Sequence, residues 1–293
     1  MRLLARLLAL LALSLAAACS DKAPAPPEQG GPALWRVQRG GLDGWLFGTI
    51  HVLPKGVAWQ TGAITDAMGK ADRLVLEAAD LQDEQKTLML FEKMGRSAGL
   101  PPLENRVPPD ERAALDKALG DGGTSSQQLS GYESWAAAML LSAAAQQSLH
   151  VSQEEGVEPV LIAAFKAKGK PIGGLETVER QFGAFDTLPE AAQRRLLVQT
   201  VHEAKDMKGL YDRILDAWVK GDMEAIAKED QRGEQPDPMV EEAILVARNR
   251  DWVKAIEALS GHPFLAVGAG HLTGRENLIA LLQARGFTVT RVQ

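Results

Sequence analysis

Short runs of apolar residues recur near both ends of the chain, and each run predicts a buried strand. Residues 45–47 and 264–267 are apolar throughout, and each run is followed by a Gly-x-x-His sequence. Residues 73–77 and 170–176 are two further short runs, and both end in a glutamate. Uninterrupted apolar runs bounded by glycine or polar residues are typical of strands in an α/β sheet.

Two patterns indicate how the ends of the chain join this sheet. Residues 34–37 and 45–47 flank a glycine-rich loop at 40–44, which predicts a β-hairpin. At the other end we expect a strand at 263–267, a helix from about 275 to 285 and a strand at 287–290. This order predicts a strand-helix-strand unit with the second Gly-x-x-His sequence at its first turn.

The middle of the chain has a mostly helical pattern, from about residue 81 to residue 199. Prolines and glycines interrupt this pattern and divide it into several helices. Residues 135–145 are apolar nearly all round, so we expect this helix to be buried. Further helices are expected to about residue 228 and again from 239 to 259. The predicted fold class is therefore α/β with a large helical insertion.

Two histidines lie just past predicted strand ends. His51 and His271 stand three residues after Gly48 and Gly268, and Gly270 directly precedes the second histidine. Ligands bind at the carboxyl edge of parallel strands in an open α/β sheet, so the two histidines are predicted to share one site. Glycine at this position would allow a tight turn and leave room for a ligand beside the imidazole.

The carboxylates of Glu77 and Glu176 are placed like the histidines, at the ends of predicted strands. Imidazole and carboxylate groups are ordinary ligands of Zn, Mn, Co and Fe, so these side chains are compatible with a divalent metal site. A bound metal would lower the pKa of a water molecule, and a spare carboxylate would act as general base. Two satisfied structural histidines are the alternative, and the residue types leave both open.

Two other motifs do not predict a site. His202 and Glu203 begin like the zinc-binding helix of a metalloprotease, but Asp206 stands where that motif requires histidine. We therefore expect a solvated helix face there. The glycines from Gly268 to Gly274 lack the spacing of a dinucleotide-binding loop, so we expect no phosphate cradle.

The composition is that of a globular protein, with 45% hydrophobic and 24% charged residues among 293. A chain of this length has a sizeable core without disulfides. The formal net charge is −6 at pH 7. A negative chain is poorly suited to nucleic acid or to an anionic lipid surface, so we expect neither as a binding partner.

The N-terminus has the features of a secretory signal peptide, which we assign to residues 1–18. A basic start is followed by an apolar run, and Leu15-Ala16-Ala17-Ala18-Cys19 resembles a bacterial lipobox. The resemblance implies cleavage before Cys19 and acylation of this cysteine, which is the only one in the chain. A plain signal peptide cut near Ala18, leaving an unpaired thiol, is the alternative.

The residues after the cysteine predict how the protein is anchored. Ser20 favours the outer membrane by its resemblance to lipoprotein sorting signals. Residues 19–32 are rich in proline and glycine and predict a flexible tether. We therefore expect a domain at 33–293 that faces the periplasm and is held to the membrane by lipid at Cys19.

Six sequence blocks carry a family resemblance through their order and spacing. They are Leu34-Trp35-Arg36-Val37, Gly48-Thr49-Ile50-His51, Leu76-Glu77, Gly173-Gly174-Leu175-Glu176-Thr177-x-x-x-Gln181, Arg248-Asn249 followed by Trp252, and Val267-Gly268-x-Gly270-His271-Leu272. Together they resemble the TraB/GumN family, which is related to the Tiki metalloproteases and more distantly to the erythromycin esterase and ChaN-like proteins. The resemblance covers about residues 33 to 291.

The resemblance implies a mixed central sheet in which the two Gly-x-x-His motifs face each other across one cleft. From the Tiki branch it implies metal-dependent peptide hydrolysis, with His51, His271 and Glu77 around a divalent cation such as Mn, Co or Zn. It also implies that Glu176 and Arg248 support catalysis, the arginine by pairing with a carboxylate or with oxyanion charge. A structural ion pair is the alternative for these two residues.

One position departs from the family pattern. Members commonly have Gly-Val-Asp where this chain has Gly156-Val157-Glu158. The longer side chain argues against a direct ligand role for Glu158.

The sequence therefore favours a lipid-anchored, metal-dependent hydrolase whose substrate is a peptide or protein of the cell envelope. The alternative is a non-catalytic lipoprotein that binds or sequesters a peptide in the same cleft. A scaffold for envelope or exopolysaccharide assembly is a third hypothesis, suggested by the family name alone. The hydrolase would need the metal and Glu77 for turnover, whereas the peptide-binding lipoprotein would need them for binding alone.

Overall fold

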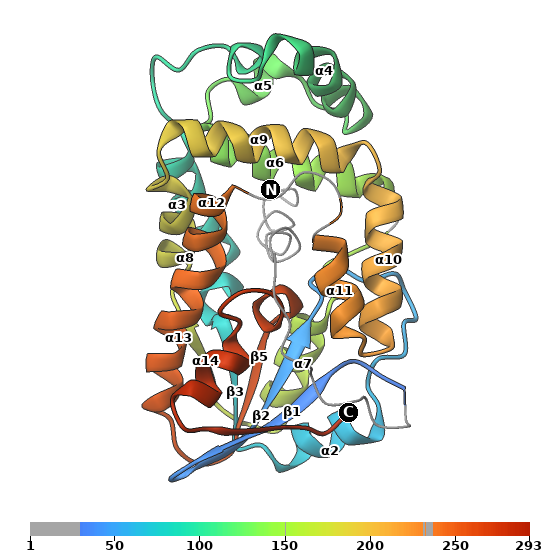
Figure 1. Cartoon of the computed structure of the whole chain (residues 1–293), viewed down its shortest axis with the longest axis vertical. Coiled ribbons are helices and arrows are strands. Elements are labelled where there is room, and N and C mark those ends of the chain that lie inside the picture. Colours follow the sequence, from blue (N-terminus) through green and yellow to red (C-terminus); the bar gives the residue numbers. More distant parts are fainter. Residues whose placement is uncertain (1–29, 150, 231, 233–236) are drawn as a thin grey trace.

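The computed structural model describes residues 30–149, 151–230, 232 and 237–293 (Figure 1). The predicted signal peptide, the lipidation site Cys19 and the tether up to residue 29 lie outside these residues. In the part that is described, no helix is both long enough and apolar enough to cross a membrane.

One six-stranded mixed sheet underlies the fold, with the strand order β4-β3-β5-β2-β1-β6. Four neighbouring strands, β4, β3, β5 and β2, run parallel, whereas β1 is antiparallel to both β2 and β6. The strands are β1 Leu34–Arg39, β2 Leu42–Thr49, β3 Arg73–Ala78, β4 Ile172–Glu176, β5 Pro263–Gly268 and β6 Thr288–Arg291. The predicted α/β class and mixed sheet are confirmed.

The hairpin predicted near the N-terminus is present. β1 pairs with β2 in a register that places Arg39 opposite Leu42, so two residues form the turn. Gly40 has a φ of 55°, a left-handed conformation that glycine adopts without steric cost.

The C-terminal helix α14, Leu278–Ala284, begins three residues after the position predicted from the sequence. Glu276 has a positive φ of 47°, which is incompatible with a right-handed helix. Asn277 then caps the helix, because its side chain accepts a hydrogen bond from the backbone N–H of Ala280. The start of the helix is therefore set by its cap and by the turn before it.

Helices cover the sheet and form a separate lobe at its carboxyl edge (Figure 1). α6 is buried on nearly all sides, as its apolar sequence predicts, and packs against α9 at the centre of this lobe. The α-helices are α2 Gly62–Lys70, α3 Glu84–Gly95, α4 Arg112–Asp121, α5 Ser126–Leu129, α6 Ser134–Gln146, α7 Val157–Ala167, α8 Val178–Asp186, α9 Glu190–Ala204, α10 Met207–Val219, α11 Met223–Asp230, α12 Pro238–Glu241, α13 Ala247–Glu257 and α14. A π-helix, η5 Glu242–Val246, joins α12 to α13.

The central strands are buried on both faces, which explains their continuous apolar sequences. In β5, Phe264 and Ala266 pack into a core with α2, α7 and α10, whereas Leu265 and Val267 pack into a second core with α13 and α14. Alternate side chains of a strand point to opposite faces, so the sheet lies between two helical layers. This layering leaves the carboxyl edge of the strands facing the helical lobe.

Candidate functional site

The carboxyl ends of four adjacent parallel strands carry the four side chains predicted to share a site. His51 follows β2, and His271 lies in the 3-10 turn η6, Ala269–Leu272, that follows β5. Glu77 is in β3 and Glu176 ends β4. Since these strands are neighbours, the side chains meet at one edge of the sheet. Oε1 of Glu77 lies 3.9 Å from Nε2 of His271, and protonation of either histidine lowers the pKa of Glu77.

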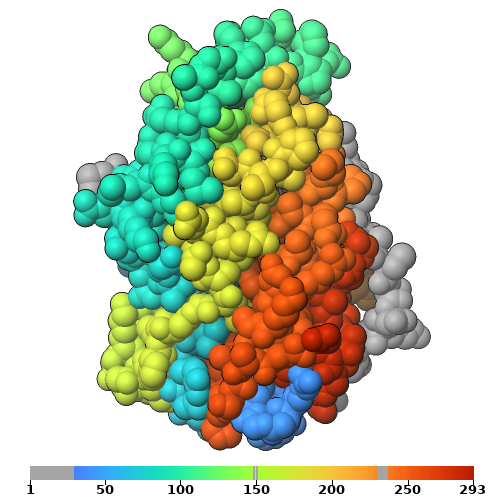
Figure 2. Space-filling model, turned by 90° about the vertical axis from the view of Figure 1, so that its left-hand side faces the viewer, coloured from blue at the N-terminus to red at the C-terminus, as the bar shows by residue number. Residues whose placement is uncertain are grey.

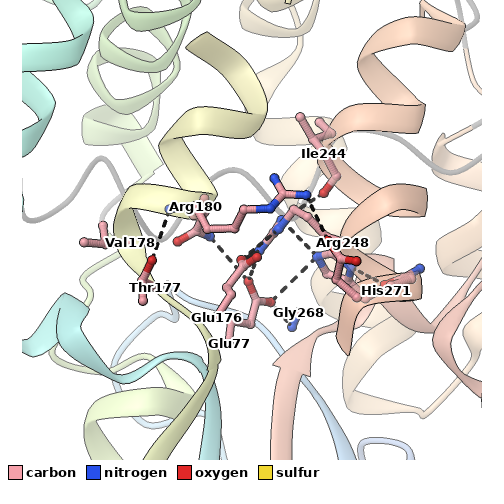
Figure 3. Close-up of polar contacts among 12 residues, drawn as sticks. Glu77, Glu176, Thr177, Val178, Arg180, Ile244, Arg248, Gly268 and His271 are labelled. Carbon is pink, nitrogen blue, oxygen red and sulfur yellow. Dashed lines mark hydrogen bonds and ion pairs between the residues drawn. The ribbon is translucent and has the colours of Figure 1, made fainter. Parts of the chain in front are cut away.

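Arg248, near the start of α13, links the two glutamates. Its Nη2 donates to Glu77 Oε2 at 2.8 Å and to Glu176 Oε1 at 2.6 Å, and its Nε donates to Glu176 Oε1 at 2.9 Å. Figure 3 shows both carboxylates turned toward the guanidinium. The three side chains are only 2%, 8% and 5% exposed, in the order Arg248, Glu77 and Glu176. The arginine therefore stabilises two carboxylates that burial would otherwise destabilise.

His271 is held in one tautomer by Asn249. The amide nitrogen of Asn249 donates to the backbone oxygen of Glu276 at 3.1 Å, so its Oδ1 faces Nδ1 of His271 at 2.7 Å. Nδ1 therefore carries the proton, and the lone pair is on Nε2. This Nε2 lies 3.3 Å from Nη1 of Arg248 and 3.9 Å from Oε1 of Glu77. The Trp252 ring packs on the imidazole, with the two ring centroids 4.2 Å apart.

His51 has a carboxylate partner in the first turn of α7. Its Nδ1 donates to Glu158 Oε1 at 2.8 Å, and the hydroxyl of Thr49 donates to the same oxygen. A Cβ on Gly156 would stand 2.1 Å from the carbonyl oxygen of His51, so only glycine allows α7 to approach this closely. The position where the chain departs from the family pattern therefore supports His51 through a hydrogen bond.

The loop that carries His51 is tied down by two aromatic side chains of α10. Trp218 Nε1 donates to the carbonyl oxygen of Gly48 at 2.8 Å, and the Tyr211 hydroxyl donates to that of Val52 at 2.9 Å. Both aromatic side chains are buried. Backbone carbonyls on either side of the histidine thus have fixed partners, which limits how far the imidazole can move.

We expect Tyr211→Phe to lower the free energy of unfolding by about 1–3 kcal/mol, because the Val52 carbonyl is left buried without a donor. The substitution removes only the hydroxyl, so packing of the ring is retained. Equilibrium urea unfolding of the two proteins measures the difference. A change below about 0.5 kcal/mol would show that water replaces the lost donor at little cost.

Sequence pattern assigned no role in the site to Thr49, Asn249 or Tyr211, and it predicted only a helix-packing role for Trp218. Thr49 directly follows Gly48 and Asn249 directly follows Arg248, so both lie within the sequence blocks that carry the family resemblance. Trp218 and Tyr211 are seven positions apart, a spacing that places both on one helix face. That spacing predicts that both side chains contact the same part of the molecule, but it does not identify the loop of His51 as that part.

The titratable groups of the site have pKa values that are shifted in different directions. Burial alone would raise the pKa of Glu77, but the positive charge of a protonated His271, then that of Arg248, and a 2.7 Å hydrogen bond from the Gly268 N–H lower it to about 2. Burial and the charge of Arg248 lower the pKa of His271 to about 3, so this ring is neutral at pH 7. Burial opposes protonation of His51, but Glu158 outweighs it and raises the pKa of that ring.

The depressed pKa of Glu77 predicts that stability decreases in acid. The ionised carboxylate contributes stability that is fully present above its ordinary pKa of 4.5 and is lost as the pH falls toward about 2. This contribution amounts to about 3 kcal/mol. Urea unfolding at a series of pH values, compared between wild type and Glu77→Gln, measures it. A constant difference between the two proteins from pH 6 to pH 2 would contradict the prediction.

One of the motif glycines, Gly48, has a different role from the one predicted. Gly48 lies within the extended strand β2, whereas Gly268 ends β5 and directly precedes the 3-10 turn η6. A Cβ on Gly48 would stand 3.1 Å from Leu272 Cδ1 and 3.4 Å from the Cα of Ala269. The missing side chain of Gly48 therefore makes room for the second histidine motif rather than for a ligand.

The site is more open at His51 than at Arg248. The side chains of His51 and Glu158 are 12% and 22% exposed, whereas that of His271 is fully buried. Figure 2 shows the segment of α8 beside that of η5 and α13 on one face, and α8 contacts η5 there. A ligand that reaches this edge of the sheet without a rearrangement would therefore meet His51 first.

The predicted metal ligands fit a metal in part. Both histidines donate Nδ1–H to an acceptor, which leaves the lone pair on Nε2, as is usual for metal-ligating histidines, although Nη1 of Arg248 lies 3.3 Å from that of His271. However, among the residues that the structure describes, no three His, Cys, Asp or Glu side chains are grouped closely enough to hold an ion. The donors and their outer partners are therefore present, but the three ligands are not assembled around one point.

The sequence blocks that carry this site match a known family. A model of the TraB/PrgY/gumN family matches residues 33–291. The "Uncharacterized protein YbaP" of Shigella flexneri is 25% identical over 259 residues, which cover 86% of this chain and 92% of that protein. The protein of the same description from Escherichia coli K12 is 25% identical over 271 residues, covering 85% and 97%. No solved structure matches.

Proposed function

The chain belongs to the TraB/PrgY/gumN family, and from this premise we propose that it is a metal-dependent hydrolase of the bacterial envelope, with a peptide or protein as substrate. One observation carries the proposal: two histidines at the carboxyl edge of adjacent parallel strands each donate Nδ1–H to an acceptor, so the lone pair that could bind an ion is on Nε2 of each ring. His51, His271 and Glu77 would hold the ion. A divalent cation there would lower the pKa of a water molecule and polarise a substrate carbonyl.

The chain's own residues prepare the site for this chemistry. Glu158 keeps the Nδ1 proton of His51 in place and, being ionised, favours electron density on Nε2. Asn249 does the same for His271 as a neutral acceptor. Glu77 is ionised at neutral pH and its two oxygens accept hydrogen bonds from Gly268 and Arg248, so we assign it a charge and ligand role rather than that of general base.

A metal-free reaction is the second candidate, because the His51–Glu158 pair by itself has the arrangement of a general base and its orienting carboxylate. Nε2 of His51 would take a proton from water, and Glu158 would stabilise the resulting imidazolium. The raised pKa of His51 is consistent with this role. The two candidates differ in whether turnover needs an ion.

The test is hydrolysis of a fluorogenic peptide library by the full-length protein, first stripped of metal and then supplied separately with Mn, Co or Zn. Turnover that appears only with an ion, together with about one ion per chain by mass spectrometry, supports the first candidate. Turnover that is insensitive to chelation supports the second. Peptide binding without cleavage under every condition would contradict both and favour the peptide-sequestering alternative.

We propose further that the protein is held in the envelope by lipid on Cys19, which lies outside the described residues. The lipobox-like sequence and the lack of any other cysteine support this anchor. Cys19→Ala should release the protein from membrane fractions into the soluble periplasmic fraction. Membrane association that persists in this variant would count against acylation.

A further inference from the structure

The guanidinium of Arg248 occupies the point where three candidate metal-site groups converge. Its Nη2 reaches Glu77 and Glu176 at 2.8 Å and 2.6 Å, and its Nη1 lies 3.3 Å from Nε2 of His271. Figure 3 shows these side chains directed at the arginine from separate strand ends. A cation of the chain itself is therefore already in place among these groups.

The nitrogen of His271 that faces Arg248 is also the one that an ion would need. Nδ1 donates to Asn249, so Nε2 has the ring's only lone pair. The nearest oxygen of Glu77, which would be a second ligand, is 3.9 Å from Nε2. An ion between these atoms would stand beside Nη1, and two positive charges repel strongly where burial excludes water. The arrangement explains why no three ligand groups are assembled here.

Arg248 also has partners that lie away from His271 and Glu77. Nη1 donates to the backbone oxygen of Ile244 at 2.9 Å, and Nε donates to Glu176 at 2.9 Å. Ile244 belongs to the π-helix η5, and π-helical turns often occur at functional sites. The guanidinium can therefore give up His271 and Glu77 while its charge stays paired with Glu176.

From these contacts we propose that Arg248 is an internal competitor of the metal ion. In the ion-free protein the arginine neutralises the carboxylates and covers the His271 lone pair; binding of a divalent ion requires its release from His271 and Glu77. This inference rests on the metal part of the proposed function. Because coupling between two binding events is reciprocal, any change that weakens the hold of Arg248 on these groups strengthens ion binding.

The experiment measures Co²⁺ affinity of the full-length protein by calorimetry, with bound ions counted by mass spectrometry after dialysis. The double variant Arg248→Met/Glu176→Gln loses one positive and one negative group, so the buried charge stays balanced. We expect it to bind Co²⁺ at least about tenfold more tightly than the single variant Glu176→Gln. Arg250→Met is the matched control, since Arg250 lies on the same helix but is 44% exposed; its affinity should equal that of wild type.

The possible outcomes are distinguishable. Equal or weaker Co²⁺ affinity in the double variant, with wild type still binding one ion, overturns the competition and leaves the metal site of the proposed function standing. Tighter binding that is abolished by adding His271→Ala supports it. If neither wild type nor any folded variant binds Co²⁺, the metal part of the proposed function fails and this inference fails with it. Near-ultraviolet circular dichroism identifies the variants that are folded.

Discussion

Arg248→Met should lower the free energy of unfolding by about 3–5 kcal/mol, because it leaves two buried carboxylates without their cation. Glu77 and Glu176 are both less than one-tenth exposed, and Arg248 is the basic side chain that donates to both. Burial and the like charge of Glu77 already raise the pKa of Glu176 even with the arginine present. Without it, at least one carboxyl group must take up a proton or draw in water.

Equilibrium urea unfolding at pH 7 measures this loss. Arg250→Met is the control, because its ion pairs with Glu242 and Glu276 are exposed and should contribute less than about 1 kcal/mol. Adding Glu176→Gln to Arg248→Met should restore part of the stability, since one of the two unpaired charges is then removed. If Arg248→Met costs less than about 1 kcal/mol, the network does not depend on the arginine charge.

The elements that form the sheet are those that local sequence pattern predicts best. A strand such as β5 is buried on both faces, so Phe264 to Val267 must all be apolar, and the pattern is visible without any knowledge of neighbours. The histidines and glutamates follow these runs directly. Their common location at one edge then follows from parallel strand order, which is why the candidate residues could be named from the sequence.

The supporting residues depend on contacts between distant elements and could not be predicted in this way. Glu158 reaches His51 only because α7 packs against the loop after β2, and Gly156 is what permits that approach. The contact of Arg248 with His271 likewise depends on how α13 lies beside β5. The family resemblance indicated that Arg248 pairs with a carboxylate, as it does with Glu77 and Glu176, but gave neither its contact with His271 nor that of Glu158 with His51. The error over Gly48 has the same origin, since the segment that fills its missing side chain comes from the far end of the chain.

Turnover should fall by about 10²-fold or more in His51→Ala. His51 is the most exposed imidazole of the site, and both candidate reactions use its Nε2, either as a ligand or as a base. Hydrolysis of the best substrate from the peptide library gives kcat/KM for each variant. His202→Ala is the matched control, because His202 pairs with Glu111 on the helical lobe, and its turnover should equal that of wild type.

Glu158→Gln tests how His51 acts, because glutamine keeps the size of the side chain and removes its charge. A smaller loss of about 10–100-fold is expected, since the orientation of the ring is partly kept while its basicity falls. If the variant binds the ion more weakly and excess metal restores its activity, Glu158 supports His51 as a ligand. If excess metal does not restore activity, the carboxylate is needed to stabilise the protonated imidazole, and His51 is the base. Activity within about twofold of wild type would mean that the 2.8 Å contact holds the loop in place but contributes nothing to the reaction.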